Sequence, residues 1–153
     1  MTVIAVDRDP AGRNLRIVAE FQSTAEHVWQ VWADPRKLER WWGPPAYPAT
    51  FVDHDLRVGG RVTYFMTGRD GQKLHAWWRI TSVDPPHSLA FEEGNADEDG
   101  PTTSIYVRLA EESGKTTMTI TCRFAEPMRD SGTAEGMRMA VAQIDALLAA
   151  TGS

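Results

Sequence analysis

Between residues 50 and 124 the chain consists of short apolar–polar alternations separated by turn sequences, and this run limits the possible folds more than any other feature. The clearest alternation is "KTTMTITCRF", residues 115–124, in which apolar side chains alternate with threonines. A period of two is typical of a strand with one face in the core and the other in water. We therefore predict antiparallel strands joined by hairpin turns at Asp70-Gly71 and Ser113-Gly114.

Two short helices are predicted between a first strand at residues 13–21 and the remaining strands. Ser23 is the expected N-cap of the first helix, in a capping box with Glu26. Asp34-Pro35 is expected to begin the second helix, because proline is favoured at the first helical position. The chain then reaches Trp41-Trp42 and stops at Gly43-Pro44-Pro45, which cannot continue a helix.

The C-terminal segment changes to a period of 3.6, which predicts one long amphipathic helix. Its apolar stripe contains Met137, Val141, Ile144 and Leu148. Such a stripe needs an apolar surface to lie on, and only the sheet can provide it. The order of elements predicts an α+β fold, with a curved antiparallel sheet of about six to seven strands around this helix. Small helix residues (Gly136, Ala140 and Ala142) leave room for a pocket between helix and sheet.

Composition excludes several classes of protein. The 153 residues suit one domain, and 42% of them are hydrophobic. The net charge is −5 and no basic run exceeds Arg36-Lys37, so nucleic acid is not an expected partner. A single cysteine, Cys122, excludes an internal disulfide, and its place in a strand predicts a buried side chain. No signal peptide or membrane span is predicted, so we expect a cytoplasmic protein.

Three segments carry a family resemblance: "VWQVWADPRKLERWWGPP", "DLRVGGRVTYFM" and "ITSVDPPHSLAFE", together with the terminal helix. They resemble the START-like, birch-pollen-allergen-like (SRPBCC) superfamily, and within it the heat-shock-protein-90 ATPase activator homologue-like branch. The resemblance covers roughly residues 13 to 150. We therefore treat residues 1–153 as a single START-like domain, with residues 1–12 as a loosely ordered extension or a short edge strand.

The resemblance implies a helix-grip fold, in which the sheet surrounds the C-terminal helix and leaves a cavity between them for a hydrophobic small molecule or lipid. It does not imply one function, since members bind ligands, transfer lipids, cyclise polyketides or assist a chaperone. Relatives often carry a small residue at the position of Trp78, so the resemblance also implies a cavity partly filled by this side chain. A small ligand, or none, is then expected.

The candidate ligand-binding residues are mostly large and apolar. Trp41 is expected in the core, whereas Trp42 is expected at the pocket lip, where its indole can stack on a ligand or donate one hydrogen bond. The full set is Trp42, Phe51, Tyr64, Met66, Trp78, Phe91, Met118, Met137 and Val141. The sequence does not decide which of these side chains belong only to the core.

No catalytic or metal-binding signature is found, and neither a cofactor nor a metal is expected. Residues 53–55, "DHD", have ligand chemistry, but strand alternation places His54 on the opposite face from both aspartates. Residues 57–60 are expected to form a turn with Arg57 solvated or paired to an acid. The candidates for acid–base chemistry are His75, Tyr64, Tyr106 and Asp53.

The sequence thus favours a cavity that binds an apolar ligand or lipid. A cofactor-free cyclase or hydrolase-like enzyme with a buried His, Tyr or Asp remains an alternative, and whether any reaction is catalysed stays open. A chaperone-cofactor role is a second alternative, which only the family resemblance suggests. A homodimer through a sheet edge or the tryptophan-rich lip also remains possible.

Overall fold

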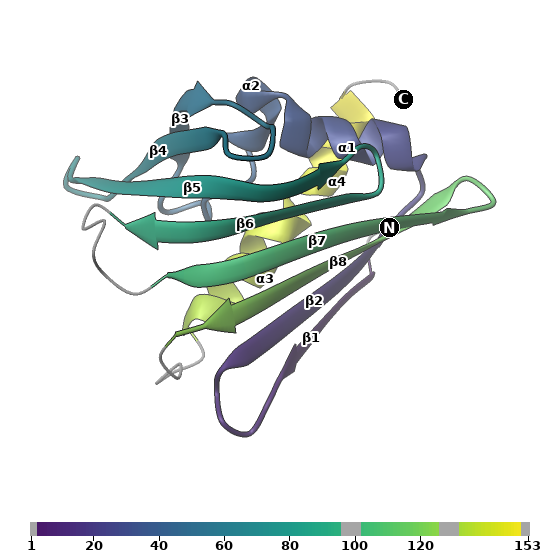
Figure 1. Ribbon diagram of the computed structural model, residues 1–153, viewed down its shortest axis with the longest axis horizontal. Helices are drawn as coiled ribbons and strands as arrows, with labels where there is room; N and C mark the ends of the chain where they lie inside the picture. Colours follow the sequence, from purple (N-terminus) through teal and green to yellow (C-terminus); the bar gives the residue numbers. More distant parts are fainter. Residues whose placement is uncertain (1–2, 96–101, 126–131, 151–153) are drawn as a thin grey trace.

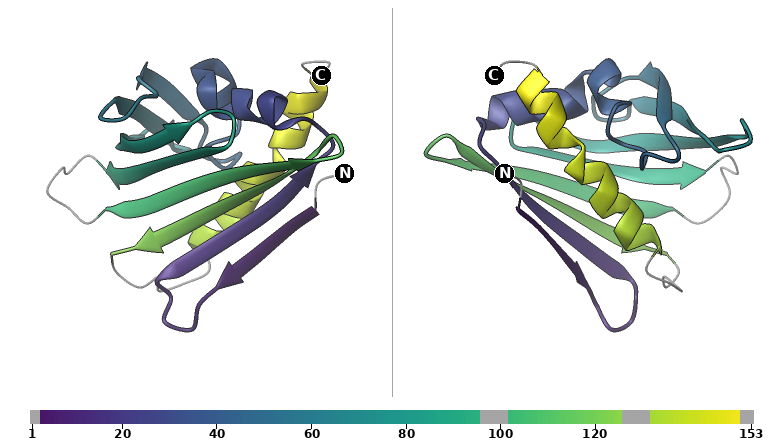
Figure 2. Two further views of the ribbon diagram at one scale, coloured as in Figure 1. Left: turned by 45° about the vertical axis from the view of Figure 1, so that its right-hand side comes forward. Right: turned by 180° about the vertical axis from the view of Figure 1, so that it is seen from behind.

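The computed structural model describes residues 3–95, 102–125 and 132–150, and in this part of the chain one antiparallel sheet carries helices on one face (Figures 1 and 2). The strands are β1 (Val3–Arg8), β2 (Asn14–Phe21), β3 (Ala49–His54), β4 (Arg61–Thr67), β5 (Lys73–Asp84), β6 (Ser88–Asn95), β7 (Thr103–Glu112) and β8 (Lys115–Phe124). The helices are α1 (Ala25–Ala33), α2 (Pro35–Leu38), α3 (Gly132–Ala142) and α4 (Ile144–Ala150).

The sheet runs in the order β1-β2-β8-β7-β6-β5-β4-β3, and every neighbouring pair is antiparallel. The predicted α+β class and curved antiparallel sheet are therefore confirmed, with a difference in strand number. Eight strands are described rather than six to seven, because Val3–Arg8 pairs with β2 and becomes an edge strand. The other edge is β3, which lies next to the short helix α2 in Figure 1.

The C-terminal helix crosses the inner face of the sheet (Figure 2), but it is interrupted at Gln143 instead of being continuous. The Gln143 N–H donates to the Ala140 carbonyl at 3.1 Å, a tighter turn than that of an α-helix. Its side-chain amide donates to the carbonyls of Trp41 (3.3 Å) and Gly43 (2.9 Å). This residue therefore joins the helix to the segment that carries the paired tryptophans. Among the described helices, none combines the length and apolar character that crossing a bilayer requires.

The start of each short helix follows from its capping residue. Asp34 caps α2 as predicted, and its carboxylate accepts the N–H of Arg36 at 2.9 Å. The cap of α1 is Thr24 rather than Ser23, since the Thr24 hydroxyl accepts the His27 N–H at 3.2 Å. The Ser23 hydroxyl contacts the His27 ring instead, at 3.0 Å.

The two predicted hairpin turns differ in length. Ser113-Gly114 is a two-residue turn with φ values of 53° and 77°, as a hairpin with right-handed twist requires. Asp70-Gly71 lies in a longer loop between β4 and β5, which the N–H of Gly68 closes on the Gln72 carbonyl at 2.8 Å. The dipeptide therefore marks this turn correctly but does not define its length.

The chain directly after Trp42 has no room for a side chain at Gly43, so a substitution there should lower the stability of the fold. A Cβ at Gly43 would lie 2.1 Å from the Tyr47 carbonyl oxygen, whereas a Cβ at Gly136 in α3 meets nothing within 4 Å. We expect Gly43→Ala to reduce the free energy of unfolding by about 1–3 kcal/mol, the usual range for overpacking. Gly136→Ala is expected to raise it by about 0.5–1 kcal/mol, because alanine is the better helix former. Urea denaturation of both variants checks this, and equal stabilities would contradict it.

Candidate ligand pocket between sheet and helix

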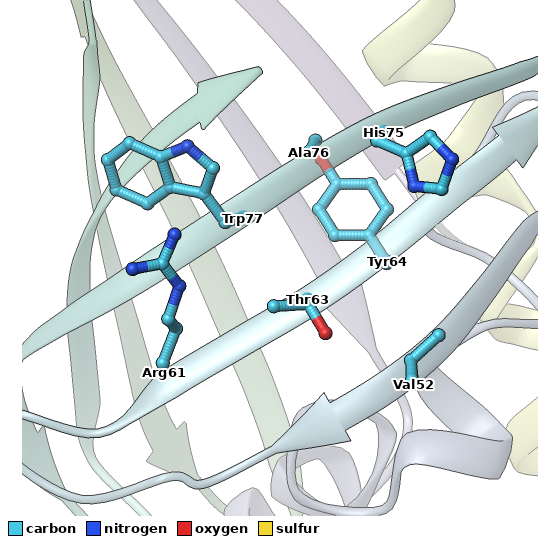
Figure 3. Close-up of a pocket in the computed structure, with 7 residues that line it drawn as sticks. All are labelled: Val52, Arg61, Thr63, Tyr64, His75, Ala76 and Trp77. Carbon is cyan, nitrogen blue, oxygen red and sulfur yellow. The ribbon is translucent and has the colours of Figure 1, made fainter. Parts of the chain in front are cut away.

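Tyr64 lines two hollows, which lie on opposite faces of the sheet. The inner pocket, of about 310 Å³, is lined by Trp42, Pro44, Tyr64, Met66, Glu93, Gly136 and Met137. The outer hollow, of about 410 Å³, is lined by Val52, Arg61, Thr63, Tyr64, His75, Ala76 and Trp77 (Figure 3). The inner pocket is the one bounded by both the sheet and α3, where the fold predicts a ligand.

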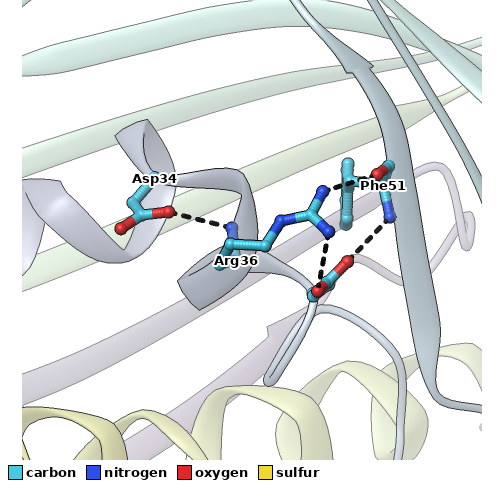
Figure 4. A network of polar contacts seen from close by, with 4 residues as sticks. Asp34, Arg36 and Phe51 are labelled. Atoms are coloured by element: carbon cyan, nitrogen blue, oxygen red, sulfur yellow. Dashed lines mark hydrogen bonds and ion pairs between the residues drawn. The ribbon is translucent and has the colours of Figure 1, made fainter.

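The lip of the inner pocket is held by contacts between α2 and the edge strand β3. The Arg36 guanidinium donates to the Phe51 carbonyl at 2.8 Å (Figure 4), and the Glu39 carboxylate accepts the Phe51 N–H at 3.1 Å. These side chains satisfy backbone groups that an edge strand would otherwise leave unpaired. The indole of Trp41 donates to the Val31 carbonyl at 2.8 Å, which fixes the chain directly before Trp42.

The deep part of the space between helix and sheet is filled by aromatic rings. Trp78 is fully buried and stacks on Phe91 with ring centroids 4.0 Å apart and planes 18° from parallel. Trp42 meets Trp78 edge-on at 4.9 Å, and Phe51 stacks on Tyr64 at 4.8 Å. Such ring pairs contribute about 0.5–1.5 kcal/mol each beyond their buried area. The open space of the inner pocket lies beside this packing, next to Trp42 and α3.

A carboxylate lies at the floor of this otherwise apolar pocket. Glu93 Oε2 accepts a hydrogen bond from the Tyr64 hydroxyl at 2.5 Å and one from the Trp78 indole at 2.9 Å. Both bonds use the same oxygen, so Oε1 has no hydrogen-bond partner among the residues that the structure describes. A carboxylate oxygen without a partner next to an open pocket is available to a ligand.

The pKa values of this carboxyl and of two nearby groups, Tyr64 and Cys122, are raised. Burial raises the pKa of Glu93, although the hydrogen bonds from Tyr64 and Trp78 act in the opposite direction. Burial, together with the nearby Glu93 charge, raises the pKa of Tyr64 well above its ordinary value. Burial and the same charge raise the pKa of the Cys122 thiol to about 12. Cys122 is thus a buried, protonated thiol, as the strand pattern predicts.

Trp42 presents the second polar group of the pocket. Only 4% of its surface is exposed, and its indole N–H is buried without a hydrogen-bond partner in the described structure. The N–H lies near enough to the Tyr64 hydroxyl to lower the pKa of that group, but it makes no regular hydrogen bond to it. A buried donor left unpaired costs about 1–3 kcal/mol, which a ligand that accepts this hydrogen bond would recover.

The structure divides the predicted ligand-binding residues into two groups. Four of them line the inner pocket: Trp42, Tyr64, Met66 and Met137. The other five are buried behind it in the core: Phe51, Trp78, Phe91, Met118 and Val141. Met118 is occupied by the core itself, because its sulfur accepts the Trp32 indole N–H at 3.4 Å. Of the small helix residues, Gly136 lines the pocket, whereas Ala140 is buried and Ala142 is exposed.

Of the four acid–base candidates, Tyr64 alone lines the inner pocket. His75 lies in the outer hollow (Figure 3), and Tyr106 has 45% of its surface exposed. Asp53 is exposed and accepts the Thr63 hydroxyl at 2.7 Å. The neighbouring His54 ring contacts the Trp32 carbonyl at 3.1 Å, and no group of three metal-ligating side chains occurs among the described residues.

The turn at residues 57–60 has the backbone that its glycines suggest. Gly59 has a φ of +83°, and a Cβ at Gly60 would lie 2.1 Å from the Asp55 carbonyl oxygen. Arg57 pairs with the Asp55 carboxylate at 3.0 Å, and both side chains are well exposed. These residues belong to a surface turn away from the inner pocket.

Glu93 was not among the predicted site residues, although the sequence contains a signal for it. Strand β6 places Leu89 and Phe91 in the core, and the period of two puts Glu93 on the same face. A charged residue in register with two core residues is unusual and indicates a functional or structural role. Its hydrogen bonds to Tyr64 and Trp78 require the pairing of three strands, which the sequence alone does not define.

Comparison with known proteins places this chain in a family. The model of the Activator of Hsp90 ATPase homolog 1-like protein family matches residues 22–149. The chain belongs to this family. Its fold is the helix-grip fold of the SRPBCC superfamily, in agreement with the sequence resemblance. A search of the curated proteins found no match.

Solved structures of similar proteins support this assignment. Protein Ms6760 from Mycobacterium smegmatis is 47% identical, with 97% of this chain and 99% of that chain covered and a TM-score of 0.85. A protein from Arthrobacter aurescens is 44% identical, with 95% and 91% covered and a TM-score of 0.87. The AHSA1 protein from Silicibacter pomeroyi is 26% identical, with 90% and 99% covered and a TM-score of 0.73.

The raised pKa of Glu93 predicts how stability depends on pH. The unfolded chain loses this proton near the ordinary pKa of 4.5, whereas the folded protein keeps it to a higher pH. Between the pKa of the unfolded chain and that of the folded protein, the folded state holds more protons than the unfolded state. The free energy of unfolding of the wild type therefore falls as the pH rises through this range. Glu93→Gln has no titrating group here. We expect the stability of Glu93→Gln relative to wild type to increase as the pH rises from 4.5 and then to level off.

Urea denaturation of both proteins in steps of about half a pH unit measures this difference, since paired proteins cancel the titration of all other groups. A stability difference that stays constant or falls as the pH rises would show that the carboxyl is not shifted upward.

Proposed function

We propose that the protein binds a small, mainly apolar molecule in the inner pocket, at the mouth of the space between sheet and α3. The observation that carries this proposal is the buried Trp42 N–H without a partner, in a pocket whose lining is mainly apolar apart from Glu93 and the Tyr64 hydroxyl. The pocket volume of about 310 Å³ is at the lower end of the range for small-molecule sites. Ring-shaped ligands suit it, because Trp42 and Tyr64 both offer aromatic surfaces.

The filled interior sets an upper limit to the ligand. Trp78 and Phe91 close the space behind the pocket, so a long acyl chain has no described channel to enter. A compact aromatic molecule fits this geometry better than a lipid does. The family resemblance supports a ligand-binding role of this kind, in a cytoplasmic protein that needs neither cofactor nor metal.

A second function, acid–base catalysis, is favoured by the direct contact between Tyr64 and Glu93. A half-buried carboxyl with a raised pKa that is hydrogen-bonded to a phenol can take and return a proton at a bound substrate. Conversion of a bound compound, measured by mass spectrometry and abolished by Tyr64→Phe, would support the enzyme over the simple binding protein. The activity would be of the cofactor-free cyclase or hydrolase-like kind.

Filling the pocket from α3 tests the binding function. Gly136 lines the pocket and has open space at its Cβ, so Gly136→Leu should occupy the site without displacing other atoms. We expect compounds from a screen of fatty acids, aromatic acids and phenols to raise the Tm of the wild type. Saturation at 100 times Kd stabilises by about 2.7 kcal/mol, or several degrees. Gly136→Leu should lose at least tenfold in affinity for every hit.

Met139→Leu is the matched control, because Met139 lies on the same helix and is 40% exposed outside the pocket. This variant is expected to bind like the wild type. Hits that bind Gly136→Leu equally well would place the ligand elsewhere and contradict the proposal. If no compound binds and a purified Hsp90-type chaperone does, with a change in its ATPase rate, the chaperone-cofactor function replaces it.

A further inference from the structure

Resting on the proposed function, we infer that the inner pocket selects a neutral ligand that carries a hydroxyl group, such as a phenol, over acids and hydrocarbons of the same shape. Two polar atoms at the pocket carry this inference: Glu93 Oε1 and the Trp42 indole nitrogen. Both residues line the inner pocket together with Tyr64, whose hydroxyl donates to the other oxygen of Glu93.

Glu93 requires a hydrogen-bond donor from the ligand. Its Oε2 atom already accepts from Tyr64 and Trp78, which fixes the orientation of the carboxylate and leaves Oε1 for the pocket. An O–H donor to a carboxylate forms a charge-assisted bond, which is stronger than a bond between neutral groups. A ligand carboxylate has no proton to donate and would be repelled by the ionised Glu93.

Trp42 requires a hydrogen-bond acceptor from the ligand. Its indole N–H is buried without a partner at the lip, and an indole can only donate. A protonated amine could pair with Glu93, but it has no lone pair for Trp42. A hydrocarbon satisfies neither group, so both would remain unpaired beneath it.

A hydroxyl group satisfies both requirements with one atom, because its oxygen accepts from Trp42 while its hydrogen is donated to Glu93. If Glu93 is protonated, the hydroxyl oxygen can accept from both groups, so the preference over hydrocarbons holds in either ionisation state, whereas the preference over acids requires the ionised carboxylate. Sites built to pair a ligand hydroxyl reject analogues that lack it much more strongly than apolar pockets reject a change of size.

Three probes of the same shape test the inference: 2-naphthol, 2-methylnaphthalene and 2-naphthoate, titrated by calorimetry at about pH 7.5. We expect 2-naphthol to bind at least about tenfold more tightly than either of the others, as one hydrogen bond to a charged group provides. Trp42→Phe and Glu93→Gln should each reduce this ratio several-fold, mainly by weakening 2-naphthol. His75→Ala, in the outer hollow, should leave all three affinities unchanged.

The outcomes separate this inference from the proposed function. Equal affinity for 2-naphthol and 2-methylnaphthalene, or tighter binding of 2-naphthoate, would overturn the hydroxyl preference while the apolar pocket stands. Binding of none of the probes would overturn both. The wild-type ratio is decisive by itself, so the conclusion does not depend on the folding of the variants, which circular dichroism and Tm check separately.

Discussion

The stacking of Trp78 on Phe91 determines where a ligand can enter this protein. Both rings are buried, and they fill the space that a curved sheet and a crossing helix would otherwise leave empty. Replacing a buried tryptophan by a small residue costs about 3–5 kcal/mol, so this packing contributes a large part of a typical domain stability. The inner pocket lies where the aromatic packing ends, between Trp42 and α3.

The position of Glu93 follows from the same packing. Its strand carries core residues on the inner face, so the carboxyl is placed at the boundary between filled core and open pocket. Burial there disfavours the ionised form, and the two hydrogen bonds from Tyr64 and Trp78 partly compensate. The side chain that closes the interior, Trp78, therefore also orients the main polar group of the site. Because Trp78 belongs to the core and also holds Glu93, a substitution of Trp78 would alter both the core packing and the site.

Most of the fold could be predicted from the sequence because its signals are local. The alternation of β8, the cap at Asp34 and the apolar stripe of the C-terminal segment each act within one element. The break at Gln143 could not be predicted, since it depends on hydrogen bonds to carbonyls about 100 residues away in the sequence. The sequence could not decide whether residues 1–12 contain the edge strand β1 or form a loose extension, because such segments have similar sequences.

The candidate site was less predictable for the same reason. Trp42 was expected at the lip because Trp41, three residues after the buried Leu38, was expected in the core, and this spacing is a local signal. For the apolar candidates, the alternation predicts which face of the sheet a side chain is on, but not whether it lies in the core or at the pocket. Phe91 in the core and Met66 at the pocket therefore cannot be distinguished from the sequence. Glu93 combines a local face with non-local partners. Its face was predictable, whereas its role depends on strands that only the fold brings together.

The central claim is that ligands bind at Trp42 on the inner face, and the indole N–H signals of the six tryptophans test it most directly. Titration of 2-naphthol into ¹⁵N-labelled protein, with Trp42→Phe to assign the signal, reports which indole meets the ligand. We expect the Trp42 N–H resonance to move furthest and downfield, because it gains a hydrogen bond. A largest shift at Trp77, whose indole lines the outer hollow and already donates to the Asn95 carbonyl at 2.9 Å, would contradict the claim.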